Sequence, residues 1–181
     1  MISKRKILVA AALTCIATQG AFAADGTITF NGSVTAQTCT INGNGTGAKD
    51  LTVALPTVST STLASAGNTA GRTPFNIALT ACTPKSGNVH TFFEAGPTIN
   101  PSTGNLVVAS GGASNVEIQL LNVSDQSAIK LGSADASQNS KAVAINSSGA
   151  ATLQYYAQYY ATGSATAGAA NSSVMYTLSY Q

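Results

Sequence analysis

The chain has 181 residues, of which only 8% are charged and 44% are hydrophobic. Ordinary globular domains carry about 25% charged residues, whereas disordered chains are charged and poor in apolar residues, so this chain is predicted to fold with a weakly polar surface. The formal net charge is +2, and no basic patch or stripe provides the electrostatic footprint of nucleic-acid binding.

Residues 1–23 have the pattern of a secretory signal peptide. A basic start at residues 4–6 is followed by an apolar run over 7–17 and by a small-x-small cleavage site that ends at Ala23. The apolar run is too short to span a bilayer as a stable helix. We therefore expect cleavage after Ala23, which removes three basic residues and leaves a mature chain with a net charge of −1.

The mature chain opens with an alternating segment. Ile28, Phe30, Gly32 and Val34 are in phase, so in an extended chain they share one face. The last residues alternate in the same way, because Val174, Tyr176, Leu178 and Tyr180 fall on one face of a predicted strand over 172–180. A strand without a hairpin partner at each end indicates a protein that joins to copies of itself, since sheet edges are normally covered or charged.

Cys39 and Cys82 are the cysteines that remain after removal of the signal peptide. In an exported chain such a pair predicts one structural disulfide, which would constrain the unfolded state by about 4 kcal/mol in the chain-entropy model. The competing interpretation, a metal-binding or catalytic pair, lacks supporting ligands.

Between the two ends, the sequence is a succession of short period-two segments separated by Gly, Pro, Asn and Ser clusters. Strands are predicted near 27–42, 50–55, 73–82, 89–95, 105–110, 115–123, 128–131, 141–146, 151–161 and 172–180. Residues 59–70 are predicted as either a short helix or a loop. Many short strands at this spacing indicate an antiparallel β-sandwich.

Candidate catalytic and metal-binding residues are sparse. The single histidine, His90, follows a Gly-Asn turn and is predicted to be a solvated surface residue. A Ser-His-Asp triad would have to use it, and no Gly-x-Ser-x-Gly elbow is present. The carboxylates are scattered rather than paired, and one imidazole does not make a zinc or copper site. We therefore expect no catalytic residues, no metal, no cofactor and no enzymatic activity.

A tyrosine cluster is the densest aromatic feature. Tyr155 and Tyr159 would share one face of a strand, and Tyr156 and Tyr160 the other. A sugar-stacking surface is conceivable, but core packing on one side and cross-strand packing on the other is the favoured interpretation.

Taken together, several segments resemble the chaperone–usher pilins, specifically the major subunits of the type 1 fimbrial family. TFNGSV at 29–34 resembles the family's donor strand, Cys39 follows at the expected short distance, and FNIALTAC at 75–82 resembles the strand with the second cysteine. NVEIQLL at 115–121 resembles a mid-chain strand. The region from Tyr160 to Gln181 resembles the C-terminal signature, with a penultimate aromatic and Gly168 fourteenth from the end.

The resemblance implies an incomplete immunoglobulin-like sandwich that lacks its last strand. It divides the chain into a signal peptide (1–23), a donor-strand extension (24–36) and a pilin domain (37–181). Donor residues Ile28, Phe30, Gly32 and Val34 would enter a neighbouring subunit's groove by strand addition. The groove, and recognition by chaperone and usher, would use Gly168, Val174, Tyr176, Leu178 and Tyr180.

The implied function is that of a structural subunit of an adhesive fimbria, secreted through the periplasm to the bacterial cell surface. Its partners would be neighbouring subunits in a homopolymer, a periplasmic chaperone and an outer-membrane usher, with host-surface glycans contacted only indirectly. The alternative within the same system is a minor adaptor or a glycan-binding adhesive pilin.

Overall fold

The structure is a computed structural model that describes Thr29, Val34 and residues 36–181. The predicted signal peptide and the donor residues Ile28, Phe30 and Gly32 lie outside the described residues. Thr35–Gln181 forms one compact unit, to which the following description refers. In this unit, no helix among the described residues is both long and apolar enough to cross a membrane.

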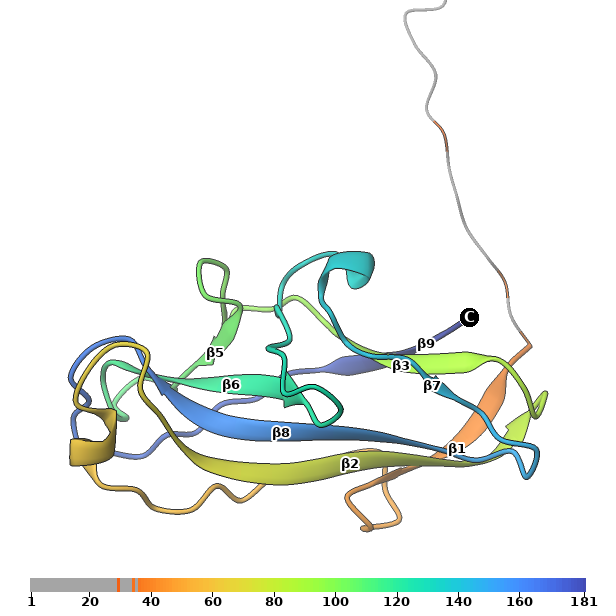
Figure 1. Ribbon diagram of the computed structural model, residues 1–181, viewed down its shortest axis with the longest axis horizontal. Helices are drawn as coiled ribbons and strands as arrows, with labels where there is room; N and C mark the ends of the chain where they lie inside the picture. Colours follow the sequence, from red (N-terminus) through yellow and green to blue (C-terminus); the bar gives the residue numbers. More distant parts are fainter. Residues whose placement is uncertain (1–28, 30–33, 35) are drawn as a thin grey trace, which may run out of the picture. The chain divides into compact units, whose positions relative to one another are not determined.

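Two antiparallel sheets make up the compact unit (Figure 1). The larger sheet has the order β1-β2-β8-β6-β5-β4, and the smaller has the order β7-β3-β9. The strands are β1 (Thr38–Gly43), β2 (Thr69–Thr83), β3 (Asn88–Phe93), β4 (Ile99–Asn100), β5 (Asn105–Val107), β6 (Val116–Asn122), β7 (Val143–Ala144), β8 (Ala151–Ala161) and β9 (Tyr176–Tyr180). Two short 3₁₀ turns, η1 (Thr60–Leu63) and η2 (Asp135–Ser137), lie in the connections.

The core lies between the sheets, which confirms the predicted β-sandwich. Leu79 and Leu153 from the larger sheet and Val89 from the smaller one are at most 1% exposed. The ring of Tyr155 lies 5.4 Å from that of Phe75 and 5.5 Å from that of Phe93, centroid to centroid. Each such side chain contributes about 1.5–3 kcal/mol on burial, so period-two alternation on β2 and β8 specifies which face of each strand enters the core.

The long connection between β6 and β7 is fixed by a buried amide. Gln138 is fully buried, and its side chain accepts from the backbone N–H of Phe93 at 2.9 Å and donates to the Phe93 carbonyl at 2.8 Å. It therefore satisfies the peptide groups of β3 where strand pairing stops. The same connection carries Asp135 to the outer side of the smaller sheet.

Charged contacts are few. In the described part of the chain, an ion pair joins Lys141 to Asp125 at 3.4 Å, and His90 is hydrogen-bonded to Asp135 at 2.7 Å. The ion pair is about half exposed, and exposed pairs contribute at most about 1 kcal/mol. Apolar burial and backbone pairing thus hold the sandwich together.

Most of the predicted strands are present, several of them shorter than predicted; of the strand predicted at 27–42, β1 contains the part from Thr38, and most of residues 27–35 lie outside the described residues. Residues 50–55 pair with no strand, and the predicted strand at 128–131 is reduced to one bridge between Leu121 and Ala128. The predicted strand at 172–180 is regular only from Tyr176. The undecided stretch at 59–70 contains η1 and the first residues of β2.

Candidate functional site: an open strand edge

The free edge of β9 is the most unusual feature of the smaller sheet. Among the described residues, β9 pairs with β3 on one side and with no strand on the other. Asn88 and Gln181 exchange both backbone hydrogen bonds, at 2.9 and 2.8 Å. Since bonded residues alternate along an antiparallel pair, the peptide groups of Tyr176, Leu178 and Tyr180 point away from β3, toward the open edge.

These three residues combine an unpaired backbone with side chains directed at the core. Tyr176, Leu178 and Tyr180 are partly buried and pack against the main apolar cluster, whereas Thr177 is exposed. Burial raises the pKa of the Tyr176 and Tyr180 hydroxyls, and the charge of Asp50 raises that of Tyr176 further. A row of unpaired peptide groups beside an apolar surface is a template for another strand.

A second extended segment, residues 50–58, also has an unpaired backbone. Leu51, Val53 and Leu55 are partly buried and pack against the core, while the residues between them are exposed. None of residues 51–58 forms a backbone-to-backbone hydrogen bond with another described residue. The alternation predicted a strand here, and the segment has a strand's side-chain pattern without a strand's neighbour.

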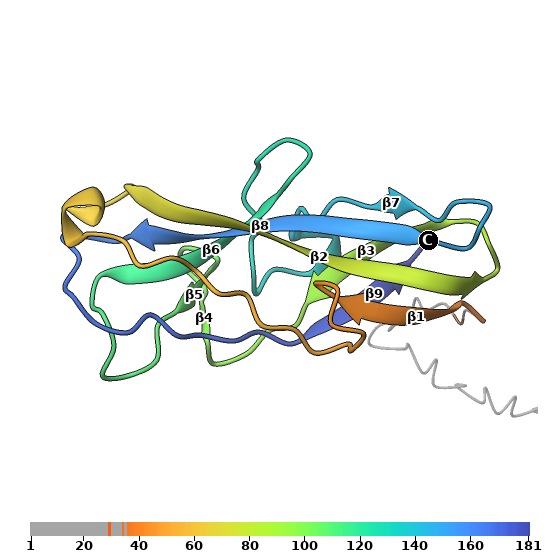
Figure 2. The same ribbon diagram turned by 90° about the horizontal axis from the view of Figure 1, so that it is seen from below.

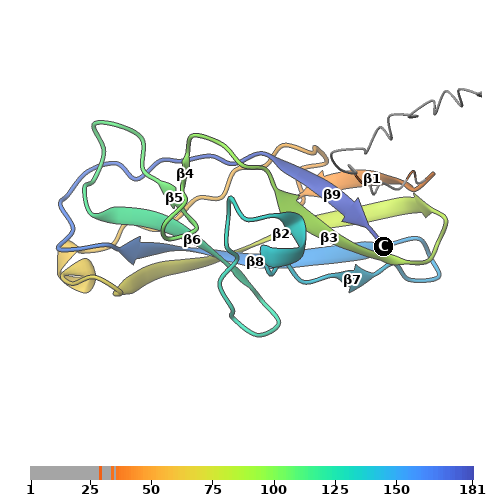
Figure 3. The same ribbon diagram turned by 90° about the horizontal axis from the view of Figure 1, so that it is seen from above.

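The two unpaired segments border the same region. The Tyr176 hydroxyl donates to the Lys49 carbonyl at 2.7 Å, which joins the start of β9 to the start of the second segment. Figures 2 and 3 show residues 44–58 and the chain that leads from β8 to β9 both running lengthwise along the molecule to η1. The unpaired edge of β9 and the unpaired segment 50–58 are therefore joined at the start of each, and the region that they border is called the groove below.

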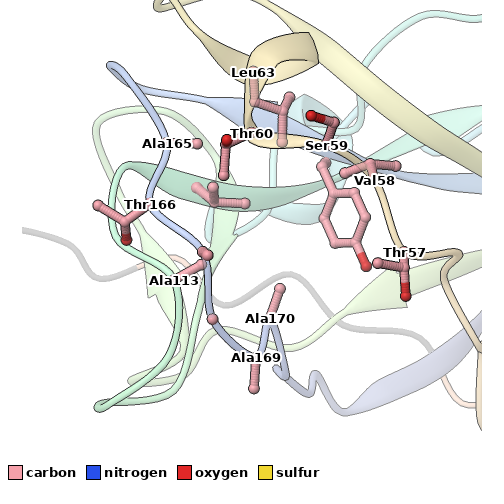
Figure 4. A pocket seen from close by; sticks show the side chains of 14 residues that line it. Thr57, Val58, Ser59, Thr60, Leu63, Ala113, Ala165, Thr166, Ala169 and Ala170 are labelled. Carbon is pink, nitrogen blue, oxygen red and sulfur yellow. The ribbon is translucent and has the colours of Figure 1, made fainter.

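Near η1, residues 57–58 of the second segment and residues 165–170 of the connection to β9 line a hollow of about 300 Å³ (Figure 4). One wall consists of residues 57–60 and Leu63 and the other of residues 165–170; Ala113, Val116 and Tyr159 complete the lining. Most of these side chains are small or apolar, and none is charged. The hollow can thus receive an apolar side chain.

Gly168 lies in the wall of this hollow, where two backbones meet. A β-carbon on Gly168 would lie 2.6 Å from the amide nitrogen of Ala113, and one on Gly112 would clash with the carbonyl oxygen of Ala169. The Ala113 N–H donates to that carbonyl at 2.8 Å. Only residues without a side chain fit this crossing.

The predicted site residues divide into three groups. Tyr176, Leu178 and Tyr180 lie on β9, Val174 precedes that strand and packs against the core, and Gly168 lines the hollow. Val34 is fully exposed and belongs to the other unit of the chain. Ile28, Phe30 and Gly32 are outside the described residues.

The predicted disulfide is confirmed. Cys39 in β1 is bonded to Cys82 in β2 across a sequence separation of 43. Cys82 is fully buried, so the bond ties the edge strand β1 to the core.

His90 was wrongly predicted to be a solvated surface residue. It is 5% exposed, and its Nε2 lies 2.7 Å from Oδ1 of Asp135, whose Oδ2 accepts from the Ser179 hydroxyl at 3.1 Å. In a catalytic triad the histidine stands between nucleophile and acid, whereas here the aspartate stands between the other two. The three side chains instead connect β3, η2 and β9. The described residues hold no cluster of three or more His, Cys, Asp or Glu side chains that could bind a metal.

The sequence did not predict that the segment 50–58 borders the groove. Leu51, Val53, Leu55 and Val58 were not identified as groove residues, although the alternation at 50–55 was recognised. In the sequence, no short turn connects this segment to a neighbouring strand, and this was the one indication that its edge is unpaired.

Comparison with known proteins identifies relatives of the whole domain. The model of the FimA type-1 fimbrial protein family matches residues 55–181. The F17 fimbrial protein of Escherichia coli is 51% identical over 174 residues, with 93% of this chain and 94% of that protein covered. The major fimbrial subunit SMF-1 of Stenotrophomonas maltophilia (strain K279a) is 52% identical over 162 residues, with 87% and 94% covered. The solved P pilus rod subunit PapA superposes with a TM-score of 0.59 at 20% identity, covering 79% of this chain and 99% of PapA, which shows the same fold.

Proposed function

Because the chain belongs to the FimA type-1 fimbrial protein family and is a structural subunit of a fimbria at the cell surface, we propose that it polymerises head to tail by strand addition. The unpaired edge of β9 opposite the unpaired segment 50–58 supports this proposal most strongly. A strand laid between them would pair on both sides and complete the smaller sheet. A head-to-tail contact of this kind does not close, so it makes a filament.

The donated strand is residues 28–34 of the neighbouring subunit. Ile28, Phe30 and Val34 would cover the core between the two walls, and their burial contributes about 5–9 kcal/mol at 1.5–3 kcal/mol each. Backbone bonds to Tyr176, Leu178 and Tyr180 add to this affinity and set the register. Gly32 occupies the position along the donor where a side chain does not fit.

Antiparallel insertion fits the site better than parallel insertion. Every strand pair of both sheets is antiparallel, and a donor that continues this pattern runs opposite to β9. Its last apolar residue, Val34, then lies beyond the start of β9, on the side where the hollow at residues 165–170 opens. The uncharged lining of that hollow suits a valine side chain.

Before polymerisation, a subunit with this groove exposes apolar surface and a bare strand edge, which is an aggregation hazard. A periplasmic chaperone would cover the edge with a strand of its own, and an outer-membrane usher would exchange it for the next subunit's donor. Export through the periplasm would depend on cleavage of residues 1–23. The relative named as a major subunit, at 52% identity, supports a major rather than an adaptor role.

The test is electrophoresis of exported protein with and without residues 25–34. The full chain is expected to give high-mass ladders that resist SDS and collapse to monomer on heating in acid, and the shortened chain to give none. A stable soluble monomer that needs no chaperone would contradict the proposal, because the groove would then already be filled.

A further inference from the structure

A second hollow lies on the other side of the molecule's larger sheet, over strands β2 and β8, which run side by side in Figure 1. Its volume is about 250 Å³. The floor consists of two cross-strand pairs, Pro74 opposite Tyr156 and Asn76 opposite Gln154. These residues point away from the core, since the alternating Phe75 and Tyr155 are buried.

The walls of the hollow are held in place by the backbone. Asn44, in the turn after β1, donates its N–H to the Asn76 carbonyl at 2.8 Å, and Val123, in the turn after β6, donates to the Gln154 carbonyl at 3.3 Å. Asn44 has a positive φ of 48°, a conformation that asparagine tolerates better than most residues. Both walls are thereby anchored to floor residues, and the hollow is a preformed feature of the fold.

Three amide side chains at this hollow are open to solvent or nearly so, since Asn44 and Gln154 are exposed and Asn76 is half-buried. The side chains of Asn44, Asn76 and Gln154 make no hydrogen bond to any described residue. Elsewhere on the same sheet face, polar groups are engaged: Gln158 donates to Gln119 at 2.9 Å and accepts from Arg72 at 2.8 Å. The amides at the hollow can thus donate and accept hydrogen bonds to a ligand, whereas the amide of Gln158 beside it is already bonded within the protein.

An aromatic ring completes the lining and is itself fixed. The guanidinium carbon of Arg72 lies 5.6 Å from the centroid of the Tyr156 ring. Arg72 donates to the side-chain amide oxygens of Gln158 at 2.8 Å and Gln126 at 2.7 Å. Arg72 therefore orients the tyrosine, and together Tyr156 and Pro74 present an apolar surface between the amides.

The chemistry of these groups specifies a ligand class. Amides both donate and accept hydrogen bonds, as hydroxyl groups do, and no residue that lines the hollow is charged. The volume is below the roughly 300–1,000 Å³ of pockets for drug-sized molecules, so the ligand is small. From this set of groups we infer that the hollow binds one ring of an uncharged saccharide, with its hydroxyls on Asn44, Asn76 and Gln154 and its C–H face on Tyr156.

Saturation-transfer NMR of the protein as purified from cells, fibre or monomer, tests this inference without depending on polymerisation. The probes are the methyl glycosides of glucose, galactose, mannose and N-acetylglucosamine, with N-acetylneuraminic acid and N-acetylglucosamine 6-sulfate as acidic counterparts. The variants are Gln154→Ala and Asn44→Gly, the latter in a turn outside the strands of the floor. Thr152→Ala is the matched control, because Thr152 is exposed on β8, two residues along the same face, and does not line the hollow.

At least one neutral glycoside is expected to bind saturably, to bind about five- to tenfold more weakly to Gln154→Ala and to Asn44→Gly, as for one lost hydrogen bond, and to bind Thr152→Ala unchanged. The inference is overturned if no neutral glycoside binds, or if both pocket variants bind as the wild type does. Binding confined to the acidic sugars that survives Gln154→Ala but not Arg72→Gln would also overturn it, because the site would then be the guanidinium.

Discussion

Gly168 and Ala113 approach so closely that a β-carbon on Gly168 would lie 2.6 Å from the amide nitrogen of Ala113. This crossing holds residues 165–170 against the loop before β6 and so shapes one wall of the hollow near η1. Gly168 was singled out because it is fourteenth from the end of the chain, and the close backbone packing explains why this position has no side chain.

Gly168→Ala is therefore expected to destabilise the domain by about 1–3 kcal/mol, as other overpacked sites are. Thermal unfolding of the protein as purified from cells, with its groove filled, measures the loss. Gly96→Ala is the control, since its β-carbon would meet nothing within 4 Å. Equal melting temperatures for the two variants would show that the crossing relaxes without cost.

Replacing both Cys39 and Cys82 by serine should lower the free energy of unfolding by about 2–5 kcal/mol, because the unfolded chain loses a cross-link. Denaturant titration gives this value. Adding a reductant should lower the stability of the wild type toward that of the double variant and leave the variant unchanged. A reductant-sensitive double variant would contradict this account.

Tyr176→Phe should cost about 0.5–1.5 kcal/mol by removing the hydroxyl that donates to the Lys49 carbonyl. The matched control is Tyr180→Phe, whose hydroxyl bonds to no residue in the described part of the chain. Both tyrosines lie on β9 with partly buried rings, so a comparable loss in the two variants would mean that the bond to Lys49 contributes nothing.

The stability of the domain should fall at alkaline pH because of Tyr155. Burial raises the pKa of this hydroxyl above its usual 10.0, and the hydrogen bond with Ser140 offsets only part of the effect. The unfolded chain then releases the proton more readily than the folded one, so stability is fully present below pH 10 and decreases as the pH rises through the folded-state pKa. Unfolding measured between pH 8 and 12 should show this decrease in the wild type. A Tyr155→Phe variant should show a shallower decrease, and the remainder belongs to Tyr159, Tyr176 and Tyr180, whose hydroxyl pKa values are also raised by burial. A profile identical to that of the wild type would refute the assignment to Tyr155.

Gly32→Leu should weaken polymerisation without much effect on the fold of the subunit that donates the strand. The SDS-resistant ladder of exported protein measures polymer length. Ser33→Leu adds the same side chain to the opposite face of the donated strand and should leave longer ladders. Normal fibre assembly by Gly32→Leu would count against the proposed register.

Local alternation was sufficient to predict most of the sandwich. β2 and β8 followed from period-two patterns, and the predicted division of the tyrosines is confirmed, since Tyr155 is buried in the core and Tyr156 lies on the outer face. The two-residue strand β4 was missed because it is too short to carry a pattern.

Long-range contacts explain the remaining errors. His90 was misplaced because its partner, Asp135, is 45 residues away, and nothing near His90 in the sequence indicates that pairing. Residues 50–55 have a strand's pattern without pairing because the pattern records which side chains face the core, not whether a neighbouring backbone is present. The strand proposed to pair with residues 50–58 belongs to another subunit. The role of this segment therefore could not be predicted from strand pairing within one chain.

The scarcity of ion pairs has a consequence for the medium in which the protein can persist. Salt weakens attraction between exposed charges, with a Debye length of about 10 Å at 0.1 M that shrinks to about 3 Å at 1 M. In the described part of the chain, the exposed pair of Lys141 and Asp125 is the contact most open to such screening. Amides, hydroxyls and small apolar groups make up most of the surface, and salt does not screen their contacts in this way. The stability of the fold is therefore expected to change little between low salt and 1 M salt.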